Sequence, residues 1–198
     1  HDRGLWLNRL DIVNRDKIMA GVTLILEGIG EDLRREGLVR TPERIAEYLE
    51  EALAGYAEDP TQELAMYTTS NKDEMIILKD ISFYSLCEHH LLPFFGKVHI
   101  AYIPQNDKVA GFSNIVRVVE ILARRLQVQE RMTTDIADAM IAAIQPKGVL
   151  IVVEAEHLCL TMRGIKKPGS KIVTSAVRGR MRRIATRNEA LTLMERAG

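Results

Sequence analysis

The chain has 198 residues, of which 46% are hydrophobic and 27% are charged, and its 27 basic side chains balance its 27 acidic ones. This length suits one globular domain with a sizeable core, and the zero net charge gives no argument for a nucleic-acid or membrane partner. No apolar run approaches the length of a transmembrane helix. The chain shows no signal peptide and only two cysteines, so we expect a cytoplasmic protein with reduced thiols.

The N-terminal part of the chain is predicted to be helical. Apolar residues at helical spacing predict a helix over residues 16–29. Thr41, Pro42 and Glu43 are typical of a helix start, with Thr41 as the N-cap, and that helix is expected to run to about residue 54. A polar stretch, 59–73, leads into β structure. We expect a single domain, 1–198, with a helical part (1–70) and a second part (74–198).

The second part is predicted to mix strands and helices. Strands are expected over 75–83 and 97–103, the latter with Val98, Ile100 and Tyr102 on one face. The remaining expected elements are helices over 114–126 (with Ser113 as N-cap) and 130–144, a long strand over 148–163, a strand over 171–177 and a helix over 186–196. The predicted class is α+β, with long antiparallel strands and helices packed on one face.

Both cysteines lie beside histidines, in Cys87-Glu88-His89-His90 and in His157-Leu158-Cys159. Thiolate and neutral imidazole are the ligands that Zn²⁺ prefers. Cys87 and His90 are close enough in sequence for one tight turn to aim both at a single ion. On a strand, His157 and Cys159 would share a face. A Cys, His, Cys ligand set leaves one tetrahedral position for water, which is typical of a catalytic zinc.

Three alternatives to a catalytic zinc stay open at this point. They are a Cys87–Cys159 disulfide, two inert core thiols, and a closed structural site formed by Cys87, His90, His157 and Cys159. An open zinc site would lower the pKa of its water toward ~7 and favour hydrolytic attack on a poor electrophile. His89 and His157 are then candidates for proton transfer, against the alternative of buried histidines that only bond a carbonyl.

Two further groups of residues suggest a substrate. Gln129 and Glu130 place an amide beside a carboxylate, which can hold a ring with adjacent N–H donors and a carbonyl; the alternative is a solvated helix start. Ser113 at a helix N-terminus and Arg117 one turn later form a small anion site. Arg163, in the polar row of the predicted strand, and Arg44, at another helix start, would add positive charge, unless each is only a surface residue.

Three segments together resemble GTP cyclohydrolase I. They are 85–94 with 96–100, 124–131, and 156–159 with 162–164, while 35–38 and 41–44 fit the N-terminal helical part of that family. The resemblance implies the tunnelling fold, a four-stranded antiparallel sheet with two helices on one face, extended by N-terminal helices and forming the catalytic part over 74–198. It also implies a homodecamer of two stacked rings, with active sites at subunit interfaces.

The resemblance further implies zinc-dependent hydrolytic opening of the guanine imidazole ring of GTP. The products would be 7,8-dihydroneopterin triphosphate and formate, feeding tetrahydrofolate or pterin biosynthesis. The zinc ligands would be Cys87, His90 and Cys159, and His89 and His157 would transfer protons. Gln129 and Glu130 would hold the guanine edge. The triphosphate would meet Ser113, Arg117, Arg163 and Arg44.

The sequence departs from the family pattern in two places. Asn114 follows Ser113 where the family typically has a lysine that contacts the triphosphate, and 177–183 is rich in arginine where the family is usually apolar. Two alternatives therefore remain: a paralogous cyclohydrolase that opens a related purine without a triphosphate, and a non-catalytic member with a structural zinc. The second is disfavoured, because His89, Gln129 and Glu130 would then have no reason to occur together.

Overall fold

The structure, a computed structural model, describes residues 13–68 and 74–196. Residues 1–12, 69–73 and 197–198 lie outside the described residues, and with them the predicted boundary between the helical and catalytic parts. The chain divides into two compact units, His1–Glu58 and Asp59–Gly198. Within the described residues, no helix combines the length and the apolar character needed to cross a membrane.

Over its described residues, 13–58, the first unit has two helices, as predicted, followed by a short 3-10 turn. These elements are α1 (Arg15–Gly28), α2 (Thr41–Ala52) and η1 (Ala54–Ala57). Arg15 joins the two helices through ion pairs to Glu47 at 3.1 Å and Glu50 at 3.2 Å. The predicted N-cap of α2 is wrong, because the cap position is Arg40 and no side chain caps it. Thr41 is already helical, and its hydroxyl donates to the Gly37 carbonyl.

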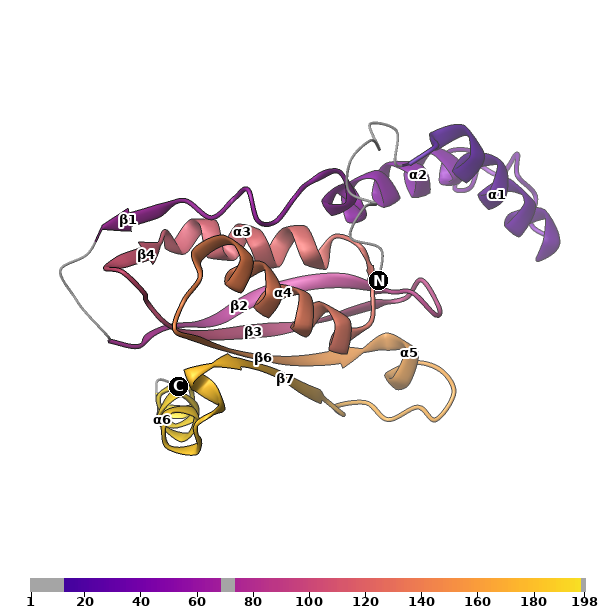
Figure 1. The fold of residues 1–198 in the computed structure, drawn as a ribbon. Helices are drawn as coiled ribbons and strands as arrows, with labels where there is room; N and C mark the ends of the chain where they lie inside the picture. The colour runs from indigo at the N-terminus through magenta and orange to yellow at the C-terminus, as the bar shows by residue number, and fades with distance from the viewer. Residues whose placement is uncertain (1–12, 69–73, 197–198) are drawn as a thin grey trace. The chain divides into compact units, whose positions relative to one another are not determined.

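The second unit is built on a sheet with the strand order β5-β2-β3-β6-β7. The long strands β2 (Ile76–Cys87), β3 (Pro93–Ile103), β6 (Gly148–His157) and β7 (Ile172–Gly179) pair antiparallel throughout. The short β5 (Leu126–Gln127) pairs in parallel with the last two residues of β2. Helices α3 (Phe112–Ala123) and α4 (Gln129–Ile144) cover one face of this sheet (Figure 1). The predicted α+β class, with four antiparallel strands and two helices on one face, is confirmed.

The main core lies between that face and the two helices. Val98, Ile100 and Tyr102, predicted to share a face of β3, are all fully buried in it. A smaller core, which includes Leu150 and Met194, lies where the C-terminal α6 (Ile184–Arg196) follows the turn η2 (Arg180–Arg182). A two-stranded ribbon of β1 (Met66–Thr68) and β4 (Lys108–Ala110) was not predicted from the polar sequence around it.

Two boundaries differ from the prediction in ways that affect the site. The long strand does not reach Arg163: β6 ends at His157, and residues Leu158–Thr161 form the short helix α5. Leu158 and Leu160 prefer helix to strand, and the Met162 N–H donates to the Leu158 carbonyl at 3.0 Å. In addition, α3 is capped by Gly111, so Ser113 lies inside its first turn and is not the N-cap.

Candidate metal centre

The three predicted zinc ligands converge at the end of β2. Cys87 is the last residue of β2, and the N–H groups of His90 and Leu91 donate back to its carbonyl at 3.3 and 2.8 Å. This tight turn returns the His90 side chain toward Cys87. Because β3 pairs Phe94 with His157, the end of β6 lies beside the turn, and α5 brings Cys159 to the same place. The ligand atoms of Cys87, His90 and Cys159 all lie within 4.8 Å of one another.

This donor set fits a zinc ion. Zn–S bonds of about 2.3 Å at tetrahedral angles place two sulfurs about 3.8 Å apart, so only small adjustments separate this cluster from a coordinating one. Both cysteines are free thiols, with Cys87 buried and Cys159 half-buried. Burial and then the neighbouring Cys87 raise the pKa of the Cys159 thiol, so two thiolates need a cation between them. A closed structural site would need His157 as a fourth ligand. Among the described residues, the cluster contains Cys87, His90 and Cys159 but not His157.

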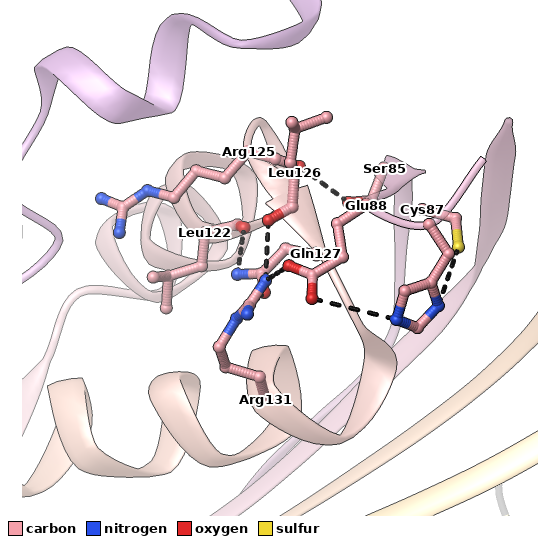
Figure 2. A network of polar contacts seen from close by, with 9 residues as sticks. Ser85, Cys87, Glu88, Leu122, Arg125, Leu126, Gln127 and Arg131 are labelled. Atoms are coloured by element: carbon pink, nitrogen blue, oxygen red, sulfur yellow. Dashed lines mark hydrogen bonds and ion pairs between the residues drawn. The ribbon is translucent and has the colours of Figure 1, made fainter. Parts of the chain in front are cut away.

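His89 lies on the same turn and is held by a polar network. Its Nδ1 is 3.9 Å from the Cys87 sulfur, and its Nε2 is 4.0 Å from a carboxylate oxygen of Glu88 (Figure 2). Arg131, in the first turn of α4, donates to that Glu88 carboxylate and, at 2.9 Å, to the side-chain oxygen of Gln127. The hydrogen bond from Arg131 lowers the pKa of Glu88. Sequence reasoning missed Glu88 and Arg131 as supports of the turn, although both lie within the motifs it used.

His157 is buried at the end of β6, only 8% exposed. Its ring stacks on Phe94, with centroids 4.6 Å apart and planes 7° from parallel. Burial lowers the pKa of His157, and the Glu130 carboxylate opposes that shift. The Nε2 atom of His157 lies 2.7 Å from the side-chain oxygen of Gln129. The structure therefore brings His157, Gln129 and Glu130 together, but the amide of Gln129 is engaged inside the protein.

The predicted anion residues are spread over the molecule. Arg163 lies at the metal cluster, with its Nη1 atom 2.9 Å from Nε2 of His90. Ser113 lies in the first turn of α3 and Arg117 one turn later, whereas the end of α3 leads through β5 to Cys87 (Figure 1). Ten residues of helix separate Ser113 from Ala123, which is about 15 Å. Ser113 and the cluster are therefore at opposite ends of α3 in one chain, with Arg117 about midway along the helix.

The other basic residues belong to other elements of the chain. Arg44 is exposed on α2, in the first unit. Arg178, in the arginine-rich segment, lies in β7 opposite Val149, near the start of β6 and away from the cluster, and pairs with Asp138 at 2.9 Å. Asn114 is half-buried, and its side-chain oxygen folds back over Gly111.

Comparison with known proteins places the chain in a family. A family model for GTP cyclohydrolase I matches residues 18–195. The GTP cyclohydrolase 1 of Carboxydothermus hydrogenoformans is 55% identical over 184 residues, which cover 92% of this chain and 96% of that protein. The GTP cyclohydrolase 1 of Geobacillus kaustophilus is 56% identical over 167 residues, which cover 84% of this chain and 89% of that protein. The chain belongs to the GTP cyclohydrolase I family.

Proposed function

We propose that the protein opens the imidazole ring of GTP by hydrolysis and yields 7,8-dihydroneopterin triphosphate and formate. One observation carries this proposal: the ligand atoms of Cys87, His90 and Cys159 lie within 4.8 Å of one another, beside two further histidines. Family membership supplies the substrate class, since relatives more than half identical over most of the chain carry the name GTP cyclohydrolase 1.

The cluster and its neighbours divide the work of ring opening. Cys87, His90 and Cys159 would hold a zinc ion, and this ion would act as the Lewis acid that activates water for attack at C8 of guanine. Hydrolysis also needs one group that takes a proton from the attacking water and another that gives a proton to the departing ring nitrogen. His89, on the turn after β2, and His157, at the end of β6, supply these groups. The exposed Glu130 carboxylate accepts the N–H groups of the guanine edge.

The separation of the anion residues supports a site shared between subunits. Arg163 lies at the cluster, whereas Ser113 lies at the far end of α3 and Arg117 one turn closer, so we expect a second copy to bring these groups to one triphosphate. The sheet also has edges at which a strand of another subunit could pair. Within the described residues, β5 covers only Leu86 and Cys87 of β2, and β7 is the other outer strand. Unpaired strand edges pair readily with another chain. We therefore propose a homo-oligomer, with the decamer and its interface sites as the family-based expectation, working in the cytoplasm.

A product assay with a panel of purines tests the proposal. Zinc-loaded protein is incubated with GTP and with guanosine, and formate and the fluorescence of the oxidised pterin are measured. We expect equal amounts of formate and pterin from GTP, and slow or no reaction with guanosine. Faster turnover of guanosine would favour the paralogous cyclohydrolase, for which Asn114 is the motivating residue. No formate from any purine, with zinc bound, would indicate a non-catalytic member.

Two kinds of variant separate metal binding from proton transfer. Cys159→Ala should lose both zinc and activity, because two remaining ligands hold the ion poorly. His89→Ala should keep zinc but lose about 10²–10⁴-fold in rate, the usual contribution of a general acid or base. Zinc content is measured by metal analysis of the same samples. Loss of zinc from His89→Ala, with zinc retained by His90→Ala, would reverse the two assignments.

A further inference from the structure

The buried amide of Gln129 has an orientation that its surroundings fix. Gln129 is 1% exposed, and its Nε2 atom lies 3.0 Å from the carbonyl oxygens of Val153 and Ile172 and 3.1 Å from the hydroxyl of Thr174. Carbonyl oxygens only accept hydrogen bonds, so the atom that faces them must be the NH₂ group. The other amide atom, the oxygen, therefore faces Nε2 of His157, at 2.7 Å.

Two threonine hydroxyls complete the network, and their partners fix the direction of each of their hydrogen bonds. The Thr133 hydroxyl lies 2.7 Å from the backbone carbonyl of Gln129, to which it must donate its one hydrogen. Thr133 is also 2.7 Å from the Thr174 hydroxyl, so it accepts there and Thr174 donates. The oxygen of Thr174 is then left to accept from the Gln129 amide. Three acceptors therefore surround the two hydrogens of the Gln129 NH₂ group, and each of them can only accept from it.

This network determines which nitrogen of His157 carries the proton. The Gln129 side-chain oxygen only accepts, so Nε2 of His157 must be an N–H, and the neutral ring keeps its lone pair on Nδ1. The parallel stack on Phe94 holds the ring plane. We infer that Gln129 is a positioning residue that fixes His157 in its Nε2–H tautomer, so that Nδ1 is the atom that exchanges a proton with the substrate. The second half of this inference rests on the proposed function.

The inference changes the role expected for Gln129. The sequence motif assigned its amide to the guanine edge together with Glu130. In the structure, the two hydrogens of the Gln129 NH₂ group already face three acceptors and its oxygen accepts from His157, whereas Glu130 beside it is exposed. A buried amide with its partners satisfied gains little by breaking these bonds to meet a ligand. Base recognition then belongs to Glu130, and Gln129 acts through His157.

The tautomer can be measured without any enzymatic activity. Protein labelled with ¹⁵N-histidine is studied by NMR in the reduced, zinc-free state, and the His157 signals are assigned by comparison with His157→Asn. We expect a protonated Nε2 and an unprotonated Nδ1. A proton on Nδ1, or a mixture of the two tautomers, would overturn the inference. This result does not depend on whether GTP is the substrate, so it separates failure of the inference from failure of the proposed function.

Kinetics then distinguish a positioning residue from a guanine contact. Gln129→Leu should lower kcat by about a hundredfold or more, the range of a misplaced general base, while KM changes by about twofold or less. The Kd of GTP for the zinc-free protein should likewise change by about twofold or less in Gln129→Leu. Glu130→Gln is the matched variant and should weaken GTP binding. If Gln129→Leu weakens GTP binding and leaves kcat intact, the inference is wrong. If that variant does not fold, the tautomer measurement decides.

Discussion

The Nη1 atom of Arg163 lies 2.9 Å from Nε2 of His90, and this hydrogen bond and metal binding exclude each other. A guanidinium only donates, so Nε2 of His90 must offer a lone pair to it. A metal bound at Nε2 would take that lone pair. A metal bound at Nδ1 would leave Nε2 protonated, with nothing for Arg163 to donate to. Either way, loading the site frees the guanidinium, which the proposed function then uses for the triphosphate.

Removal of Arg163 should therefore tighten zinc binding. We expect Arg163→Met to bind Zn²⁺ about three- to tenfold more tightly than the natural chain, because the competing charged hydrogen bond is lost. The measurement is competition with a chromophoric chelator under reducing conditions. Lys167→Met is the control, since it removes a positive charge from the same loop. Equal or weaker zinc binding by Arg163→Met, or an equal gain in both variants, would contradict the argument.

Gly96 should resist any side chain, because β3 and β6 approach closely there. It pairs with Ala155 across the sheet, and a Cβ at Gly96 would meet the backbone carbonyl of Glu154. Backbone in the middle of a sheet cannot move aside cheaply. Gly96→Ala should lower the free energy of unfolding by about 1–3 kcal/mol, measured by urea unfolding at fixed protein concentration.

The control for Gly96 lies in α1. A Cβ at Gly21 would meet nothing within 4 Å, and alanine favours helix over glycine. Gly21→Ala should therefore be neutral or stabilising by up to about 1 kcal/mol. A Gly96→Ala variant as stable as Gly21→Ala would show that the strands separate locally to admit the methyl group.

His99 should make stability depend on pH below neutrality. Burial lowers the pKa of His99, and its Nδ1 accepts a hydrogen bond from the Asp80 N–H at 3.2 Å, which protonation would break. As pH falls below about 6.5, the unfolded chain takes up a proton at this histidine and the folded chain does not, so the free energy of unfolding falls. At higher pH His99 is neutral in both the folded and the unfolded chain, so it no longer lowers the free energy of unfolding.

Replacement of His99 should reduce that slope. His99→Gln keeps a polar side chain but does not titrate, so its stability should fall less steeply between about pH 6.5 and 5 than that of the natural chain. Some slope should remain, because burial also lowers the pKa of His157. Zinc-free protein is used for both, so that metal release does not contribute. Identical slopes in the two proteins would mean that His99 is protonated as readily in the folded state as in the unfolded one.

The sequence predicted those parts of the structure that depend on local pattern. Alternation placed Val98, Ile100 and Tyr102 in the core, and the spacing of Cys87 and His90 suited the turn that brings them together. The switch from β6 to α5 was missed, because the segment 149–160, rich in Val, Ile and Leu, contains no Gly, Pro or Asn where the strand ends.

Other features depend on contacts between distant segments. The acceptors of the Gln129 amide lie 24, 43 and 45 residues further along the chain, on β6 and β7, and no local pattern reveals them. The distance of Ser113 from the cluster likewise follows from the direction in which α3 runs across the sheet. Sequence motifs therefore identified the residues of the site. They did not show which atoms of those residues are already engaged in hydrogen bonds.

Asn114 provides the sharpest test of the substrate. It lies in the first turn of α3, next to Ser113 and within one turn of Arg117, where a lysine would add a positive charge to the anion site. Asn114→Lys should lower KM for GTP by about tenfold or more, as expected from one charged hydrogen bond of about 1.5–3 kcal/mol, and leave kcat and any reaction with guanosine unchanged. Because a cation at a helix N-terminus opposes the helix dipole, the variant should also lose about 0.3–1 kcal/mol of stability. Asn114→Gln, which lengthens the side chain without charge, is the control for KM. If Asn114→Lys gives no gain with GTP while guanosine reacts faster than GTP in both proteins, the triphosphate is not what Ser113 and Arg117 bind, and the chain opens an unphosphorylated purine.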